Sequence, residues 1–195
     1  MADATNQTVR FGISNVRYAL ETATGFGEWK RLAGAVQVSF EPQGSQNTFY
    51  ADNGGYYSSN PPSSDQITIE LADLTEQAKI DLLGYRKIDD KLCEPVVAKR
   101  TRFAMGFQVE GNGTTLRGVR YGGTLARPSQ SHNTTTDSTD PDTITIEGTF
   151  LGRKFVVANE EELWLSLATT NEGDTHATYD SFWEAVPTPG TIPEE

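Results

Sequence analysis

Alternating apolar and polar residues run through most of the chain and predict a protein that is mainly β. The alternation is clearest over residues 35–41 and 65–71, where every second residue is apolar. The apolar positions of these two strands are Val36, Val38 and Phe40 in the first, and Ile67, Ile69 and Leu71 in the second. Further strands are expected over residues 10–13, 16–20, 143–147 and 155–157.

A long hairpin is predicted over residues 102–124, with its turn at 111–113. Large apolar residues occupy alternate positions from Phe103 to Val109, and the return strand follows the turn Gly111-Asn112-Gly113. The positions between them are often small, which predicts tight curvature or a close approach of other groups to the backbone. These small residues are Ala104, Gly106, Gly118, Gly122 and Gly123.

Two helices are expected beside the strands. Asp73 is the predicted N-cap of the first, and Glu76 follows it at capping-box spacing. Leu74, Ala78 and Leu82 share one face of that helix, and Gly84 is the predicted C-cap. Residues 179–186 predict a short C-terminal helix.

The expected fold class is mostly β with minor α (α+β): an antiparallel β-sandwich or barrel with one flanking helix and a short C-terminal helix. A single domain is predicted over residues 1–186, followed by a loose Pro-rich tail at 187–195. Residues 42–64 form a long Gly-, Asn-, Ser- and Tyr-rich loop in this prediction, and residues 128–142 a mobile Ser/Thr/Asp-rich loop.

Charge narrows the possible functions. The 195 residues carry 16 basic and 27 acidic side chains, a net charge of −11, which disfavours proteins that grip nucleic acid or anionic membranes. Residues 99–127 carry +5, whereas 1–98 carry −5 and 128–195 carry −11. The uneven distribution has two explanations: an ordinary solvated acidic surface, or a basic hairpin that faces acidic surface on a neighbouring copy.

No catalytic, cofactor or metal site is expected. His132 and His176 lack carboxylate or cysteine partners at ligand spacing, and Asp137, Asp140 and Asp142 lack the glycine and closing glutamate of a calcium loop. Cys93 is the only cysteine, which excludes an intrachain disulfide. The chain also shows no apolar run long enough to span a bilayer and no signal-peptide core near residue 1.

Several short strings, in order and across nearly the whole chain, are similar to the major tail protein (tail tube subunit) family of long, flexible-tailed bacteriophages. The strings are GISNVRYA at 12–19, LAGAV at 32–36 with EPQG at 41–44, FYADN at 49–53, ELADL at 70–74, FAMGF at 103–107, RPS at 127–129 and TITI at 143–146, followed by the segment 174–186.

The resemblance implies a structural virion protein without catalysis or cofactor. It implies a β-sandwich or barrel that assembles into hexameric rings, stacked into a hollow tube with a generally acidic wall. DNA passes through without specific binding. Implied partners are further copies of the chain and the tape measure, tail terminator and tail tip proteins. Assembly would occur in the bacterial host cytoplasm, without membrane anchoring.

Two sets of residues are candidates for contacts between subunits. In such tubes a long loop bridges successive rings, and residues 42–64 are the candidate for that loop. Its candidate contact residues are Phe49, Tyr50, Asp52, Asn53, Tyr56 and Tyr57. In the basic hairpin, the candidates for charge pairs between subunits are Arg100, Arg102, Arg117 and Arg120.

Two other functions remain open at this point. The inner tube of a contractile tail or secretion system has the same architecture, and a surrounding sheath would distinguish it. A free-standing carbohydrate- or peptide-binding β-module would instead use residues 47–60 as its binding site and would remain a monomer.

Overall fold

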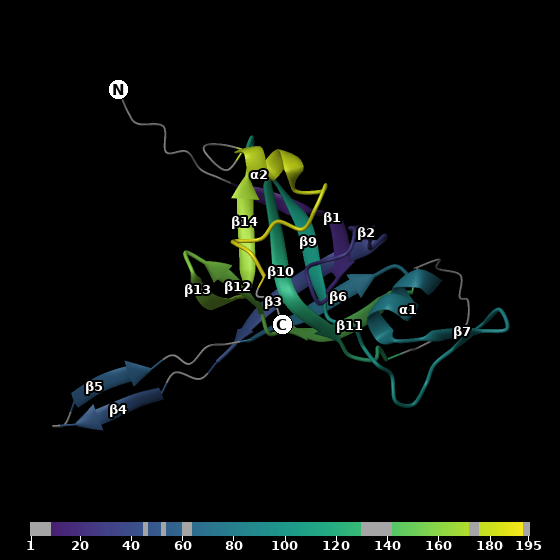
Figure 1. Ribbon diagram of the computed structural model, residues 1–195, viewed down its shortest axis with the longest axis horizontal. Helices are drawn as coiled ribbons and strands as arrows, with labels where there is room; N and C mark the ends of the chain where they lie inside the picture. The colour runs from purple at the N-terminus through teal and green to yellow at the C-terminus, as the bar shows by residue number, and fades with distance from the viewer. Residues whose placement is uncertain are drawn as a thin grey trace.

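The computed structural model describes residues 9–44, 47–51, 54–59, 64–129, 142–171 and 176–192. Its centre is an eight-stranded antiparallel sheet in the order β2-β1-β9-β10-β11-β6-β3, with β14 also paired to β10 (Figure 1). The strands of this sheet are β1 (Arg10–Leu20), β2 (Lys30–Arg31), β3 (Ala35–Gln43), β6 (Ser64–Leu71), β9 (Phe103–Gly111), β10 (Leu116–Leu125), β11 (Ile144–Phe150) and β14 (Ser166–Thr170).

Strand β10 divides the sheet into two halves. Its first part, Leu116 to Arg120, pairs with β14, and its last part, Gly123 to Leu125, pairs with β11. Gly122 lies between these parts with φ +71, and a Cβ atom there would lie 2.2 Å from the carbonyl oxygen of Gly152. Only glycine combines this backbone conformation with so close a neighbour.

The sheet is open. Among the described residues, β2 and β3 at its two ends do not pair with each other. The predicted fold class, mostly β with minor α, is therefore confirmed, and of the two expected architectures the structure has the sandwich-like one and is not a closed barrel. The alternation within strands cannot reveal closure, because closure depends on the pairing of the end strands.

A first hydrophobic core lies between the inner face of the sheet and helix α1 (Glu76–Leu83). Ile67, Ile69 and Leu71 of β6 are fully buried in it, as their spacing predicts. Ala78, Leu82 and Leu83 of α1 pack into the same core. The flanking helix is thus confirmed, and it rests on the sheet by its apolar face.

The ends of α1 follow the prediction only in part. Gly84 is the C-cap, with φ 76, as predicted. The N-cap is Thr75, not Asp73: the Thr75 hydroxyl accepts a hydrogen bond from the Ala78 backbone N–H at 3.3 Å. Asp73 instead accepts from the adjacent Leu74 N–H at 2.7 Å. Both residue types favour caps, so composition alone does not select the position.

A second hydrophobic core covers the outer face of β1, β9 and the first part of β10. Its buried residues include Ala19, Ala104 and Val119 from those strands, covered by Phe155 and Phe182. Phe155 belongs to β12 (Arg153–Val157), which pairs with β13 (Glu160–Trp164). We call β1, β9 and the first part of β10 the doubly covered half of the sheet, and β3, β6 and β11 the singly covered half.

The C-terminal segment forms much of this cover. Helix α2 (His176–Ser181) begins and ends earlier than residues 179–186, and Phe182 and Val186 are buried beyond its end. The tail is not loose over residues 187–192. The Tyr121 hydroxyl donates to the Pro187 carbonyl at 2.6 Å, and Thr191 exchanges two backbone hydrogen bonds with Val156.

Irregular strands account for further differences from the prediction. Residues 10–13 and 16–20 form one strand, β1, with a bulge between Ser14 and Arg17. A second bulge, between Ala35 and Gln37, leaves Val36 exposed instead of packed with Val38 and Phe40. β3 continues through Pro42 because it lies at the sheet edge, where a missing N–H is tolerated.

Residues 42–64, expected as a long loop, contain a β-hairpin of β4 (Asn47–Ala51) and β5 (Gly54–Ser59). Figure 1 shows this hairpin extending away from the main sheet. A second small hairpin, β7 (Arg86–Ile88) with β8 (Lys91–Cys93), was not expected. Of the predicted loop at 128–142, residues 130–141 lie outside the described residues.

Candidate functional site

Two of the four candidate arginines form ion pairs within the chain. Arg102 lies 3.4 Å from the Glu21 carboxylate and donates to the Gly152 carbonyl at 2.5 Å. Arg120 lies 3.4 Å from Asp65, whose side chain is buried. These contacts join segments that are distant in sequence, so both side chains have a role inside the subunit.

Arg117 holds the C-terminal segment onto the sheet. Its guanidinium lies 3.8 Å from the centre of the Tyr179 ring and donates to the Tyr179 carbonyl, and its Nε donates to Gln108 at 3.0 Å. Arg17 lies nearby, 4.5 Å from the Trp183 ring. Burial, together with the positive charges of Arg31 and Arg117, lowers the pKa of Arg17. Cation–π contacts therefore fix α2 and its following turn.

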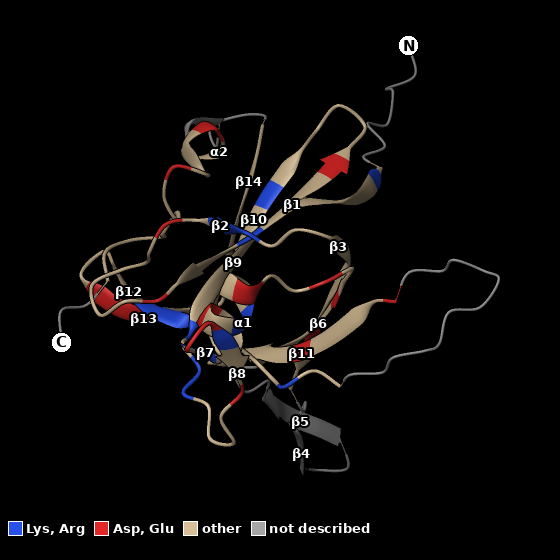
Figure 2. Ribbon diagram, turned by 90° about the vertical axis from the view of Figure 1, so that its right-hand side faces the viewer, with Lys and Arg blue, Asp and Glu red and all other residues tan. Residues whose placement is uncertain are grey.

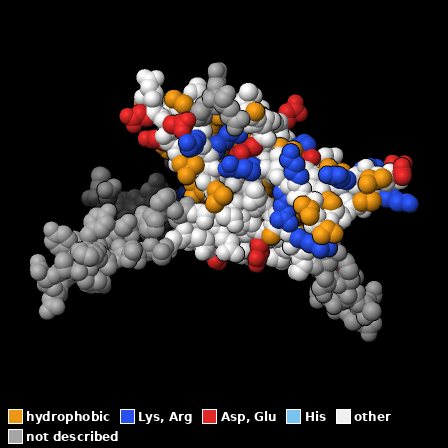
Figure 3. Space-filling model, turned by 60° about the horizontal axis from the view of Figure 1, so that its bottom comes forward, with side chains coloured by type: hydrophobic (Ala, Val, Ile, Leu, Met, Phe, Trp, Pro, Cys, Tyr) orange, Lys and Arg blue, Asp and Glu red, His pale blue; other side chains and the backbone are white. Residues whose placement is uncertain are grey.

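Arg100 is exposed and forms no ion pair within the described part of the subunit. It belongs to residues 95–100, which we call the basic valine loop. Val96 and Val97 are 104% and 87% exposed, and neither Lys99 nor Arg100 has an ion-pair partner among the described residues. In Figure 3, hydrophobic and basic side chains lie together on the right, where Figure 1 shows β7.

The candidate inter-ring residues are placed only at the level of the backbone. Phe49 and Tyr50 lie on β4, and Tyr56 and Tyr57 lie on β5, with Phe49 opposite Tyr57 in the register. Asp52 and Asn53 lie outside the described residues. The hairpin thus brings four of the six candidates together.

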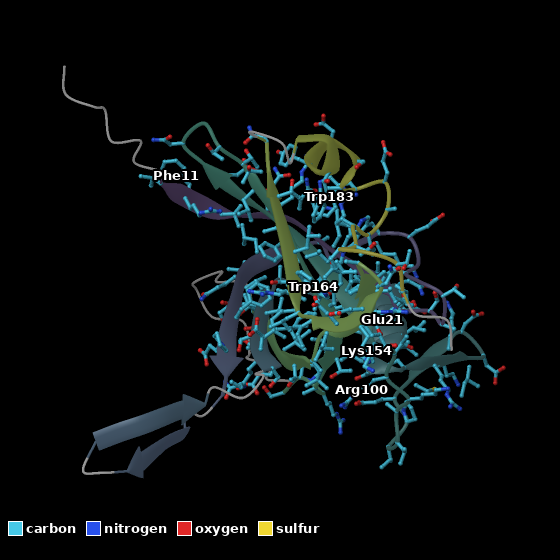
Figure 4. All side chains as sticks on the ribbon, turned by 60° about the vertical axis from the view of Figure 1, so that its left-hand side comes forward. Phe11, Glu21, Arg100, Lys154, Trp164 and Trp183 are labelled. Carbon is cyan, nitrogen blue, oxygen red and sulfur yellow. The ribbon has the colours of Figure 1, made fainter. Side chains whose placement is uncertain are left out.

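A cleft of about 530 Å³ opens beside β12 and β13. Glu21 lies in its wall with its side chain 11% exposed, between Arg102 and Arg153, and its Oε1 has no hydrogen-bond partner in the described structure. Burial, opposed by Arg102 and Arg153, raises the pKa of the Glu21 carboxyl. Figure 4 shows Glu21 and Lys154, which both line the cleft, on the same side of the molecule. Sequence reasoning missed the cleft because its lining comes from four separate parts of the chain, at residues 21–23, 102, 151–163 and 192.

The rim of the cleft is formed by an acidic hairpin, which we define as β12 and β13 together. Leu151 and Leu163 at the rim are each 59% exposed. Lys154 pairs with Glu161 at 2.6 Å, whereas Glu160 and Glu162 are exposed and have no basic partner among the described residues. Figure 2 shows the acidic run of β13 beside the basic residues of β12.

The outer face of the singly covered half is polar and contains no basic residue. No Lys or Arg occurs in β3, β6 or β11. Residues opposite one another on this face include Thr68 with Glu147, Glu70 with Thr145, and Glu41 with Gln66. The polar positions of the same alternation predict this face, and the lack of basic residues between Arg31 and Lys79 marks two of its three strands.

The structure adds little on the histidine and aspartate candidates. His132, Asp137 and Asp140 lie outside the described residues, and His176 begins α2. Within the described part of the chain, no three His, Cys, Asp or Glu side chains are grouped as metal ligands would be. None of the helices in that part is both long enough and apolar enough to cross a membrane.

Comparison of the sequence with known protein families and with curated proteins finds no match.

Proposed function

We propose that the protein is a structural subunit that assembles with itself into stacked rings and forms the tail tube of a long-tailed bacteriophage. In this proposal the rings are hexameric, and DNA passes through the tube into the host. The subunit is not an enzyme and needs no cofactor. Its other partners are the tape measure, tail terminator and tail tip proteins.

The observation that carries the proposal is the polar outer face of β3, β6 and β11. A wall along which DNA slides must hydrate well and must not bind phosphate. This face offers hydroxyl, amide and carboxylate groups, including Glu41, Glu70 and Glu147, and its strands lack Lys and Arg. Carboxylates repel the phosphate backbone, and the absence of basic side chains removes the usual source of nucleic-acid affinity.

The β4–β5 hairpin also supports assembly. An isolated two-stranded hairpin is at best marginally stable in water, and this one extends from the sheet (Figure 1). Its outer edges carry backbone groups that can pair with another strand. A hairpin of this kind gains stability when it packs against a neighbouring subunit, as an arm between successive rings does.

Electron microscopy of the purified protein at rising concentration tests the proposal. We expect rings and tubes from the intact chain, and folded, unassembled subunits when a short Gly-Ser turn replaces residues 45–62. A monodisperse monomer at every concentration would contradict the proposal and favour a ligand-binding module. A sheath around native particles would indicate a contractile system instead.

A second experiment tests the polar face. Glu41→Lys with Glu147→Lys places two basic residues on it, and we expect assembled tubes of this variant to bind duplex DNA in a salt-dependent way. Wild-type tubes should not bind it. Equal DNA binding by both would show that this face does not line the bore.

A further inference from the structure

The cleft beside β12 and β13 has the size and the lining of a binding site. Its volume of about 530 Å³ lies in the range of pockets that hold a small molecule or a few residues of a peptide. All of its lining belongs to one subunit, so a ligand binds there without any need for assembly. The self-assembly proposed above gives this cleft no role.

Positive charge is in excess in the lining of the cleft. Arg102 and Arg153 share one carboxylate, that of Glu21, at 3.4 and 3.8 Å. Lys154 has a carboxylate to itself, that of Glu161 at 2.6 Å. The lining therefore presents three cations and two carboxylates, and an anionic group on the ligand balances the difference.

Two of these cations retain hydrogen-bond donors for a ligand. Arg102 is half-exposed; its Nε faces the shared carboxylate and one Nη donates to a backbone carbonyl, whereas no bond of its other Nη occurs within the described chain. Lys154 is exposed, and the single carboxylate beside it leaves part of its ammonium group for other acceptors. Arg153 differs, because its guanidinium is largely buried and donates to the carbonyls of Thr22 and Gly25. Arg102 and Lys154 are therefore the groups that bind an incoming carboxylate.

Exposed leucines supply the apolar part of the cleft. Leu151 and Leu163 are each 59% exposed, and both line the cleft together with Ile192. Exposed apolar side chains rimmed by charge are typical of interaction sites. The lining mixes these side chains with charged ones, and such a mixture fits a peptide better than a bare hydrocarbon chain, which needs a continuous apolar wall.

The pairing of β12 with β13 places the apolar and cationic groups on one surface. Lys154 lies directly opposite Leu163 in the register, so both side chains project from the same face of the acidic hairpin. Glu161 shares that face and pairs with Lys154 there, whereas Glu160 and Glu162 alternate to the other face. The unpaired carboxylates of the hairpin therefore do not line the cleft.

We propose that this cleft binds a short peptide segment of a partner chain, in which an acidic side chain follows an apolar one. The carboxylate of the peptide contacts Arg102 and Lys154, and its apolar side chain packs on Leu151 and Leu163. This binding site goes beyond the tail-tube function and does not depend on it.

Isothermal titration calorimetry of the purified protein with three synthetic peptides tests the class of ligand. The probes are acetyl-Leu-Leu-Glu-amide and the same peptide with Gln or Lys in the third position, so they differ mainly in the charge of one side chain. We expect the Glu peptide to bind about fivefold more tightly than the Gln peptide, because its carboxylate meets two cations. The Lys peptide should bind most weakly. Equal affinities for the three peptides, or no binding of the Glu peptide, would overturn the proposal.

Two variants test whether the peptide binds in the cleft. Lys154→Gln removes one of the two cations that face the carboxylate and should weaken binding of the Glu peptide about fivefold. Leu163→Ser removes apolar contact and should weaken binding of both the Glu and the Gln peptides by a similar factor. Both side chains are exposed, so we expect both variants to fold. Lys87→Gln is the matched control, because Lys87 is also an exposed lysine of a two-stranded hairpin and pairs with Glu76 at 3.2 Å.

The outcomes separate this inference from the proposed function. Wild-type affinity in the Lys87→Gln control, with weaker binding in both cleft variants, supports the cleft as the site. If Lys154→Gln and Lys87→Gln bind the Glu peptide equally well, or Leu163→Ser binds it as the wild type does, the peptide binds elsewhere and the proposal is wrong. Neither result bears on tube formation, which electron microscopy measures without the peptides.

Discussion

The two halves of the main sheet are built from similar strands but are covered differently. The doubly covered half has the first core on one side and the second core on the other, so Met105 and its neighbour Ala104 are both fully buried. The singly covered half buries Ile67 and Ile69 but leaves Thr145 and Glu147 exposed. One half of the sheet is therefore buried on both faces, whereas the other half presents a polar face to solvent.

The largest expected effect on stability comes from truncating a side chain of the second hydrophobic core. Phe182 is 1% exposed and stacks on Trp29, with ring centres 6.1 Å apart. Phe182→Ala should lower the free energy of unfolding by about 3–5 kcal/mol, because it leaves a cavity. Urea denaturation measures this. Thr145→Ala, on the exposed face of the singly covered half, is the control and should stay within about 0.5 kcal/mol of wild type. If both variants lost similarly little free energy of unfolding, the second hydrophobic core would contribute little to stability.

A somewhat smaller effect is expected at the ion pair between the halves. Arg120 of β10 balances the buried Asp65 of β6, and its guanidinium also lies 4.9 Å from the Phe40 ring. Arg120→Ala leaves the carboxylate without its partner and should cost about 3 kcal/mol in urea denaturation. Arg100→Ala, at an exposed arginine without an ion pair among the described residues, should cost almost nothing. If Arg120→Ala were equally mild, the pair would not be structural.

A moderate effect is expected where the second core contacts β9. A Cβ atom at Gly106 would lie 2.7 Å from Cη2 of Trp29 and 3.0 Å from Cζ3 of Trp183. Gly106→Ala should therefore destabilise the protein by about 1–3 kcal/mol. Gly12→Ala on β1 is matched in chemistry but has open space around it, so its thermal midpoint should not fall. An equal fall in the thermal midpoint of both variants would show that the clash with Trp29 and Trp183 is not the cause.

The smallest expected effect is a pH dependence of stability caused by Glu21, whose side chain lies in the wall of the cleft beside β12 and β13. Burial raises the folded-state pKa of the Glu21 carboxyl above its unfolded value of about 4.3. The folded state therefore binds this proton more tightly than the unfolded state does. The resulting stability is fully present below about pH 4.3 and is lost as the pH rises through the folded-state pKa. Glu21→Gln removes this titration. The stability of wild type relative to the variant should therefore fall as the pH rises above about 4.3. A constant difference would mean that the carboxyl titrates as it does in water.

The sequence predicted what depends on local spacing. Alternation located β6, β11 and the β9–β10 hairpin, and Gly84 marked the end of α1, because side-chain period and capping are properties of neighbouring residues. The same local patterns did not predict β13 or β14. The Glu160–Glu162 run has no apolar alternation, and β14 is recognisable as a strand mainly through its pairing with β10.

The candidate contact surfaces also include features that the sequence predicts and features that only the tertiary structure reveals. Composition alone identified a basic segment at 99–127 within an acidic chain, and the polar face of β3, β6 and β11 follows from their alternation. Only the tertiary structure decided that Arg102, Arg117 and Arg120 have partners inside the subunit, whereas Arg100 forms no ion pair among the described residues. Those partners, such as Glu21 for Arg102 and Tyr179 for Arg117, are tens of residues away, and spacing along the chain carries no record of which distant groups the fold brings together.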